Sequence, residues 1–149
     1  MSEALIRAEI KTILETVSGI GAVHTYERYS RSLAEYFTLM TSGGKVNGWM
    51  IHRASTDSRR EVLPLIERYH EYKISSIYEL DDVNASEVTF QAILDAIFEA
   101  FKSENTLNGQ ALDSEPVSID FVNTEEYGGR LFHTAVLTLV VRERSTYTV

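Results

Sequence analysis

The stretch at residues 84–101, NASEVTFQAILDAIFEAF, constrains the fold of this chain more than any other. Its apolar residues recur at i, i+3, i+4, i+7, i+8 and i+11, which is the spacing of one continuous stripe along an α-helix. Asn84 with Glu87 three residues later, or Ser86 alone, can cap the start of this helix. Such a stripe needs an apolar surface to cover, so we expect the helix to lie across a β-sheet. The stripe consists of Phe90, Ile93, Leu94, Ile97, Phe98 and Phe101.

Strand patterns elsewhere in the chain predict that sheet. The last of them, residues 131–142, is apolar on both faces, which is typical of a strand at the centre of a sheet. Arg68 and His70 interrupt the apolar face of the long strand pattern, so we expect part of that face to be wet. Pro64 should lie outside the paired region. The predicted strands cover residues 23–26, 45–53, 66–80, 117–122 and 131–142.

Two further helices precede the stretch at 84–101. One covers residues 3–17, and Gly19 and Gly21 should end it. The second begins after Ser30 or Ser32 and should end at Gly43-Gly44; Ser32 and Glu35 have the spacing of a capping box. Polar residues 54–61 and 103–116 are expected to be loops, and residues 125–129 a turn. This order predicts a single α+β domain over residues 1–149, with a mainly antiparallel, mixed sheet of four to five strands and about three helices packed against it.

Composition limits the classes of function. The 149 residues include 14 basic and 22 acidic side chains, a net charge of −8, which disfavours non-specific binding to nucleic acid. The chain has no cysteine, hence neither disulfides nor thiolate metal sites. Its first residues carry charges among the apolar ones, unlike a signal peptide, and no apolar run is long enough to span a membrane. We therefore expect a cytoplasmic protein.

The sequence offers little chemistry. Four histidines fall in predicted strands, but they show none of the spacings of a zinc site. The acid pairs Asp81-Asp82 and Glu125-Glu126 lie in predicted turns, where solvated carboxylates are common. We therefore expect no catalytic residues, no metal and no cofactor. A small hydrolase or metal enzyme that uses the histidines is the least favoured alternative.

Aromatic and basic residues gather in HTYERYSRS, residues 24–32. Tyr26 and Tyr29 could dock on the core at a strand-to-helix junction, which is the favoured interpretation, whereas with Arg28 they could form an interface, because Tyr and Arg are frequent hot-spot residues. Arg59 and Arg60 are further interface candidates. For Trp49, strand parity favours the core.

Three motifs, GIGAVHTYERYSRS, KVNGWMIHR and YELDDVNASEVTFQAILDAIFEAF, resemble a family of small structural proteins of tailed phages and prophages. The resemblance covers roughly residues 5–110. In size, acidity and element order, the chain is similar to tail terminator, or tail completion, proteins. It implies a non-enzymatic subunit of a homohexameric ring that caps the tail tube and joins it to the head. The implied partners are other copies of the chain, the tail tube protein and a head-tail connector protein, and the implied location is the virion after assembly in the bacterial cytoplasm.

Two alternatives remain beside this one. A head-tail neck, or head-completion, protein would have much the same sequence pattern. A monomeric or dimeric adaptor or inhibitor could instead bind a partner through Tyr26, Arg28 and Tyr29. Within the ring hypothesis, polar segments 54–61 and 103–116 are the expected arms for contacts with neighbours, and an acidic lumen would let DNA pass without sticking.

Overall fold

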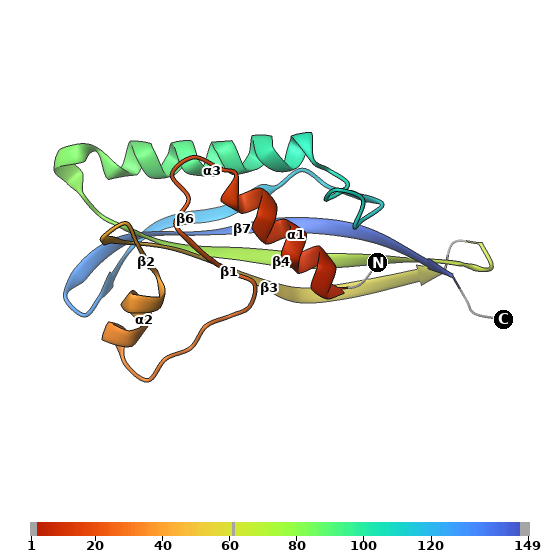
Figure 1. The fold of residues 1–149 in the computed structure, drawn as a ribbon, viewed down its shortest axis with the longest axis horizontal. Coiled ribbons are helices and arrows are strands. Elements are labelled where there is room, and N and C mark those ends of the chain that lie inside the picture. Colours follow the sequence, from red (N-terminus) through yellow and green to blue (C-terminus); the bar gives the residue numbers. More distant parts are fainter. Residues whose placement is uncertain (1–2, 61, 147–149) are drawn as a thin grey trace.

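A computed structural model describes residues 3–60 and 62–146 (Figure 1). These described residues form three α-helices, one short 3-10 helix and one mixed sheet, which is the α+β class expected from the sequence. The helical elements are α1 (Glu3–Glu15), α2 (Leu33–Leu39), η1 (Asp82–Asn84) and α3 (Ser86–Ser103). The strands are β1 (Ala22–His24), β2 (Thr41–Ser42), β3 (Lys45–Arg60), β4 (Leu65–Glu79), β5 (Asp113–Ser114), β6 (Ser118–Tyr127) and β7 (Arg130–Thr146).

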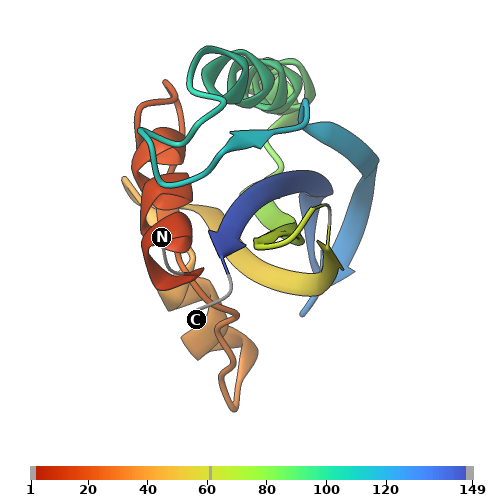
Figure 2. The same ribbon diagram turned by 90° about the vertical axis from the view of Figure 1, so that its right-hand side faces the viewer.

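The sheet is built on three long strands, with β4 between β3 and β7. Both of these pairings are antiparallel, and β6 pairs antiparallel with the other edge of β7. The short β1 adds a parallel strand to β3, while β2 and β5 each contribute two residues. The long strands twist and curl about their common axis (Figure 2), as strands of this length do. The expected central position of the last strand is confirmed, because β7 is paired on both edges.

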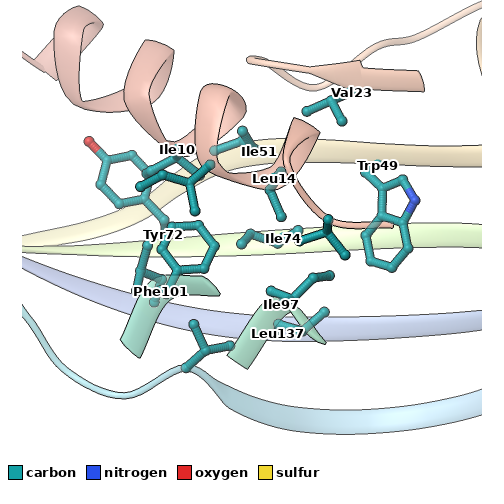
Figure 3. Close-up of a cluster of buried hydrophobic side chains, with 14 of the residues drawn as sticks. Ile10, Leu14, Val23, Trp49, Ile51, Tyr72, Ile74, Ile97, Phe101 and Leu137 are labelled. Atoms are coloured by element: carbon teal, nitrogen blue, oxygen red, sulfur yellow. The ribbon is translucent and has the colours of Figure 1, made fainter. Parts of the chain in front are cut away.

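Helices α1 and α3 cover one face of the sheet and bury the main core (Figure 3). The stripe of α3 turns inward as predicted: Phe90, Leu94 and Ile97 are fully buried, and Phe98 is half-buried. Trp49 is also in this core, with its indole Nε1–H donating to Asn47 Oδ1 at 2.8 Å. A tryptophan N–H that is removed from water needs such a partner.

The predicted cap of α3 is wrong. The N-cap residue is Ala85, in the left-handed conformation, and no side chain caps it. Ser86 is the first helical residue, and its hydroxyl accepts a hydrogen bond from the N–H of Asp81 at 2.8 Å. Asp81 in turn caps η1 by accepting from the N–H of Asn84. The preceding turn therefore uses the polar groups that the sequence seemed to offer to the helix.

Helix α2 packs on the opposite face of the sheet, over a second apolar cluster. Its start is as predicted, since the Ser32 hydroxyl accepts from the N–H of Glu35. Its end is not: α2 stops at Leu39, and Gly43-Gly44, both at positive φ, form the tight turn between β2 and β3. Two residues at positive φ suit such a hairpin turn. The second cluster is Met40, Val46, Ile77 and Phe132, with Tyr36, Phe37, Met50 and Tyr127 packed against it.

The largest error concerns residues 54–60, which belong to β3 and not to a loop. Each of Ser55, Thr56, Asp57, Ser58, Arg59 and Arg60 pairs with a residue of β4, after an irregularity between Arg53 and Ser55. Polar composition misled the prediction because the long partner strand supplies the hydrogen bonds whatever the side chains are. Pro64 lies in the turn before β4, outside the paired region, as expected. Glu61, part of the predicted loop, lies outside the described residues.

Two smaller differences involve the second half of the chain. Residues 103–116 are anchored to the body, because Leu107 and Ala111 are buried and the N–H of Leu112 donates to the carbonyl of Arg142 at 2.8 Å. β6 continues to Tyr127, so the turn consists of Gly128-Gly129 alone, both at positive φ. The segment at 103–116 is thus a docked connection rather than a free arm.

Candidate interaction surfaces

Residues 25–32, which we name the aromatic connection, link β1 to α2 and contact β3 at Met50 and His52. Tyr26 and Tyr29 are 54% and 79% exposed, so the predicted docking of these two rings on the core is wrong. Arg28 holds the segment instead. Its backbone N–H donates to Met50 Sδ at 3.3 Å, its guanidinium lies 3.2 Å from His24 Nδ1, and its guanidinium carbon is 5.1 Å from the centre of the Tyr26 ring. The cation–π contact therefore orients an exposed tyrosine without burying it.

Tyr29 projects from this connection. Its hydroxyl donates to the Glu27 carboxylate, and this hydrogen bond and the nearby negative charge raise the pKa of Tyr29. Glu27 also lies 3.1 Å from His52 Nδ1 on β3. Open pockets of about 630 and 460 Å³ flank the connection, and Tyr29, Ser30 and Arg31 line both of them. An exposed tyrosine beside two hollows is a surface on which a partner could be held.

Arg59 and Arg60 lie on a different part of the molecule. They end β3 at the tip of the hairpin, on the right in Figure 1. Arg59 pairs with Asp57 at 2.9 Å, and its guanidinium carbon lies 4.7 Å from the centre of the Tyr69 ring. The seven residue-to-residue steps from His52 to Arg59 span roughly 23 Å at the usual rise of a strand. The structure thus divides the five predicted interface residues into two separate surfaces.

Two strand edges are open along much of their length. No strand of the described residues pairs with the outer edge of β3 at residues 53–58, or with the outer edge of β6. β6 is also more exposed than the three long strands, with Ile119 40% and Phe121 44% exposed and an irregularity in its pairing between them. An unpaired edge presents backbone N–H and carbonyl groups that can accept another strand.

A polar cluster occupies the part of the sheet beyond the helices, on the face that α1 and α3 cover elsewhere. His70 is fully buried, with Nδ1 2.9 Å from Thr56 Oγ1 and Nε2 3.4 Å from Glu143 Oε2. Arg68 lies 3.7 Å from the same carboxylate. Burial lowers the pKa of His70, although the Glu143 charge opposes this shift. The predicted wet face is therefore wrong for His70, because charged neighbours cover it.

The other face of this extension carries a second network, centred on Glu67. This carboxylate accepts from Arg144 Nη2 at 2.9 Å and from the Tyr69 hydroxyl at 3.0 Å, and these bonds lower its pKa. Arg142 links the network to β5, donating from Nε to Asp113 at 3.0 Å. Neither network was predicted from the sequence. The strand register sets Glu67 opposite Arg144 and Arg68 opposite Glu143, and this register is known only from the fold.

The four histidines do not converge. His24 Nε2 lies 2.9 Å from the carbonyl of Leu39, His52 meets Glu27, and His70 meets Glu143. His133 Nε2 lies 2.8 Å from Ser86 Oγ, and its ring stacks on Phe90 with the centroids 5.7 Å apart. Across residues 3–60 and 62–146 there is no group of three His, Asp or Glu side chains that could hold a metal ion.

The Ser86–His133 pair has the atoms of a nucleophile and a base, but both residues are buried at the start of α3. Burial lowers the pKa of His133, as expected for a neutral imidazole in the core. The acid pairs likewise have local structural roles, since Asp81 caps η1 and Glu125 accepts from the Tyr127 hydroxyl.

No model of a known protein family matches this sequence, and no curated protein matches it. Among the helices of the described part, none is long and apolar enough to cross a bilayer.

Proposed function

We propose that this chain is a virion morphogenesis protein of a tailed phage or prophage, a tail terminator or completion subunit that forms a homohexameric ring. The ring would cap the tail tube and join it to a head-side connector protein. The motif resemblance over residues 5–110 supports the phage assignment. A head-tail neck protein is the nearest alternative within the same class.

The observation that carries the ring is the alternation of strand directions. β3, β4, β7 and β6 run alternately up and down across the sheet, because each neighbouring pair is antiparallel. The two open edges therefore run in opposite directions. A second copy in the same orientation can set its β3 beside β6 of the first and continue the antiparallel order. Such a head-to-tail contact uses two different surfaces and closes into a ring when the rotation between copies permits it.

The two edges also carry opposite charges. The outer part of β3 contains three arginines and one aspartate, whereas β6 contains one aspartate and two glutamates and no basic residue. Electrostatic complementarity of this kind favours the contact between β3 and β6 over contacts of either edge with itself. The basic residues are Arg53, Arg59 and Arg60, and the acidic ones are Asp120, Glu125 and Glu126.

The strand register predicts a stagger between copies. β6 begins in the row of Lys73, because Ser118 pairs with Thr138 and Thr138 with Lys73. The open part of β3 lies beyond this row, opposite residues 68–72 of β4. The β6 edge of one copy and the open β3 edge of the next lie side by side only if the second copy is shifted by about six residues along its strands. The strands of closed barrels are staggered in a similar way. An even shift keeps the same face of the sheet inward.

Light scattering and negative-stain microscopy of the purified protein test the ring. We expect closed rings, because a cyclic head-to-tail contact closes. Their mass should be that of about six subunits, the number that the motif resemblance implies. Arg53→Glu or Glu126→Arg should shift the protein toward monomer, and the two changes together should restore rings, because the stagger sets these side chains diagonally across the contact. A protein that stays monomeric at high concentration would contradict the proposal.

The particles formed when the protein is absent separate termination from a neck role. Abnormally long or unjoined tails are expected for a terminator, whereas normal tails with leaking heads would assign the protein to the neck. The exposure of Tyr26 and Tyr29 favours one further candidate, an adaptor or inhibitor that binds a partner through the aromatic connection.

A further inference from the structure

The turn between β3 and β4 ends the polar extension with apolar residues. Val62 and Leu63 are 71% and 63% exposed, and Pro64 beside them is exposed as well. We name residues 62–64 the apolar tip. Its position at the end of a projecting hairpin (Figure 1) leaves it accessible from several sides. Adjacent exposed apolar residues on a projection are typical of a contact surface.

A pocket of about 360 Å³ lies at the C-terminal end of α3. Phe98 and Phe101 supply its aromatic wall, and Pro116 and Ser114 border it from the connection to β6. Phe101 is buried in the main core, whereas Phe98 is half-buried. The pocket is thus a preformed hollow with an aromatic side, of a size that suits a few small apolar side chains.

The rim of the pocket is net acidic, and a basic side chain lies near the tip. Glu115 and Lys102 line the pocket, Lys102 lies 3.7 Å from Glu99, and Glu104 is exposed on the adjoining loop. Arg60 is exposed two positions before the tip, with Glu61 between them in the sequence. Within the described part of the chain, the side chains of Arg60, Glu104 and Glu115 make no hydrogen bond or ion pair with another residue. Arg60 of one copy can therefore face the acidic rim of the pocket on another copy.

The strand register brings the two surfaces together. Ser114 lies in the row of His70, because it pairs with Val141 and Val141 pairs with His70. The apolar tip lies about six residues beyond that row, or roughly 20 Å along the strands. This is the stagger that edge pairing requires. We propose that the apolar tip of each subunit seats in the Phe98–Pro116 pocket of the adjacent copy, an inference that rests on the proposed ring and adds a second contact to it.

The absence of native cysteine makes this contact directly testable. Leu63→Cys and Pro116→Cys are prepared as two single variants and as one double variant, and mildly oxidised. A mixture of the single variants should give disulfide-linked dimers, and the double variant a ladder up to the closed ring on a non-reducing gel. Each single variant alone should remain unlinked, because a tip meets a pocket and not another tip. Circular dichroism checks that the variants fold.

A second pair of cysteines reports on the edges alone. Ser55→Cys and Asn123→Cys fall opposite each other at the same stagger, and both positions are exposed. If the edge pair links and the tip pair does not, the ring stands and the tip contact is refuted. If both link, the inference is supported. If neither links and the protein is monomeric, the ring and the tip contact both fail. Linked tips in a protein whose edge pair stays unlinked would support the tip contact and overturn edge pairing.

Discussion

The same three strands, β3, β4 and β7, build two halves of one sheet that are stabilised in different ways. In the half covered by α1 and α3, the inward residues of the three strands include Ile51, Ile74 and Leu137, all fully buried. In the extension beyond the helices, the same face holds His70 and Glu143. Backbone pairing continues from one half to the other, with one irregularity on β3 between Arg53 and Ser55. What differs is whether helices or neighbouring side chains exclude the water.

This difference predicts different responses to substitution. Burial of apolar surface contributes about 25 cal/mol per Å² to the free energy of unfolding. An unpaired charge introduced into such a core is strongly destabilising. A buried ionic cluster, by contrast, is close to neutral as a whole but costly to leave half complete. The covered half should therefore lose stability when a charged residue replaces an apolar one. The extension should lose stability when one member of an ion pair is removed.

The largest effect is expected from Ile97→Asp, which places a carboxylate under α3 in the fully buried core. The loss should exceed about 4 kcal/mol, a large part of the stability of a typical domain. Urea unfolding followed by circular dichroism measures it, if the variant folds at all. Val88→Asp, on the exposed side of the same helix, should change stability by less than about 0.5 kcal/mol. A soluble, well-folded Ile97→Asp protein would show that this face of α3 is not buried.

A smaller loss is expected from Glu143→Ala in the extension. The change leaves His70 and Arg68 without their shared carboxylate and should cost about 1–3 kcal/mol. His70→Phe combined with Glu143→Leu should recover most of this loss, since a packed apolar pair can replace a buried ionic one. Equilibrium unfolding of the native protein, of Glu143→Ala and of the double variant gives the comparison. A double variant as unstable as the single one would mean that the pair has a specific structural role beyond burial.

The residue pattern of the sequence predicts the covered half well and the extension poorly, for the same reason. In the covered half, periodicity reports burial directly, so the stripe of α3, the position of Trp49 and the centrality of β7 follow from residue type. In the extension, residues 54–60 are polar, and their strand conformation depends on a partner strand that local composition does not reveal.

The candidate surfaces were predictable only in part. Arg59, Arg60 and Tyr29 are exposed, as interface residues must be, but their separation on two surfaces depends on the length of β3. The burial of His70 was unpredictable because its shield is assembled from three strands: Thr56 on β3, Arg68 on β4 and Glu143 on β7. Register, which links such residues, is a long-range property of the fold.

Stability should also depend on pH in two steps. The folded protein lowers the pKa of His70 and His133, so the unfolded chain, with an ordinary histidine pKa of about 6.5, binds protons more readily. The contribution of these two histidines to the free energy of unfolding is then fully present above about pH 6.5, and it is lost as the pH drops toward their folded pKa values. A second loss should follow below about pH 4, where Glu67 and Asp120, whose pKa values are lowered in the fold, take up protons.

Urea midpoints measured from pH 7.5 to pH 5 test the first step. His70 is held between Glu143 and the arginines Arg53 and Arg68, with Thr56 and Tyr72 completing its surroundings. His70→Gln should flatten the pH dependence in this range, and adding His133→Gln should remove most of the remainder. An unchanged slope in the double variant would assign the loss to other groups.

The smallest effect on stability is expected at the aromatic connection, from Tyr29→Ala. The ring is 79% exposed, so its removal should change the free energy of unfolding by less than about 0.5 kcal/mol. Tyr36→Ala is the matched control: Tyr36 is half-buried against Phe37, with ring centroids 6.2 Å apart, and its loss should be several times larger. Ring formation should be unchanged in Tyr29→Ala, because Tyr29 lies on neither open edge. If this well-folded variant keeps its rings but loses a partner that the native protein binds, the aromatic connection is a binding surface in its own right.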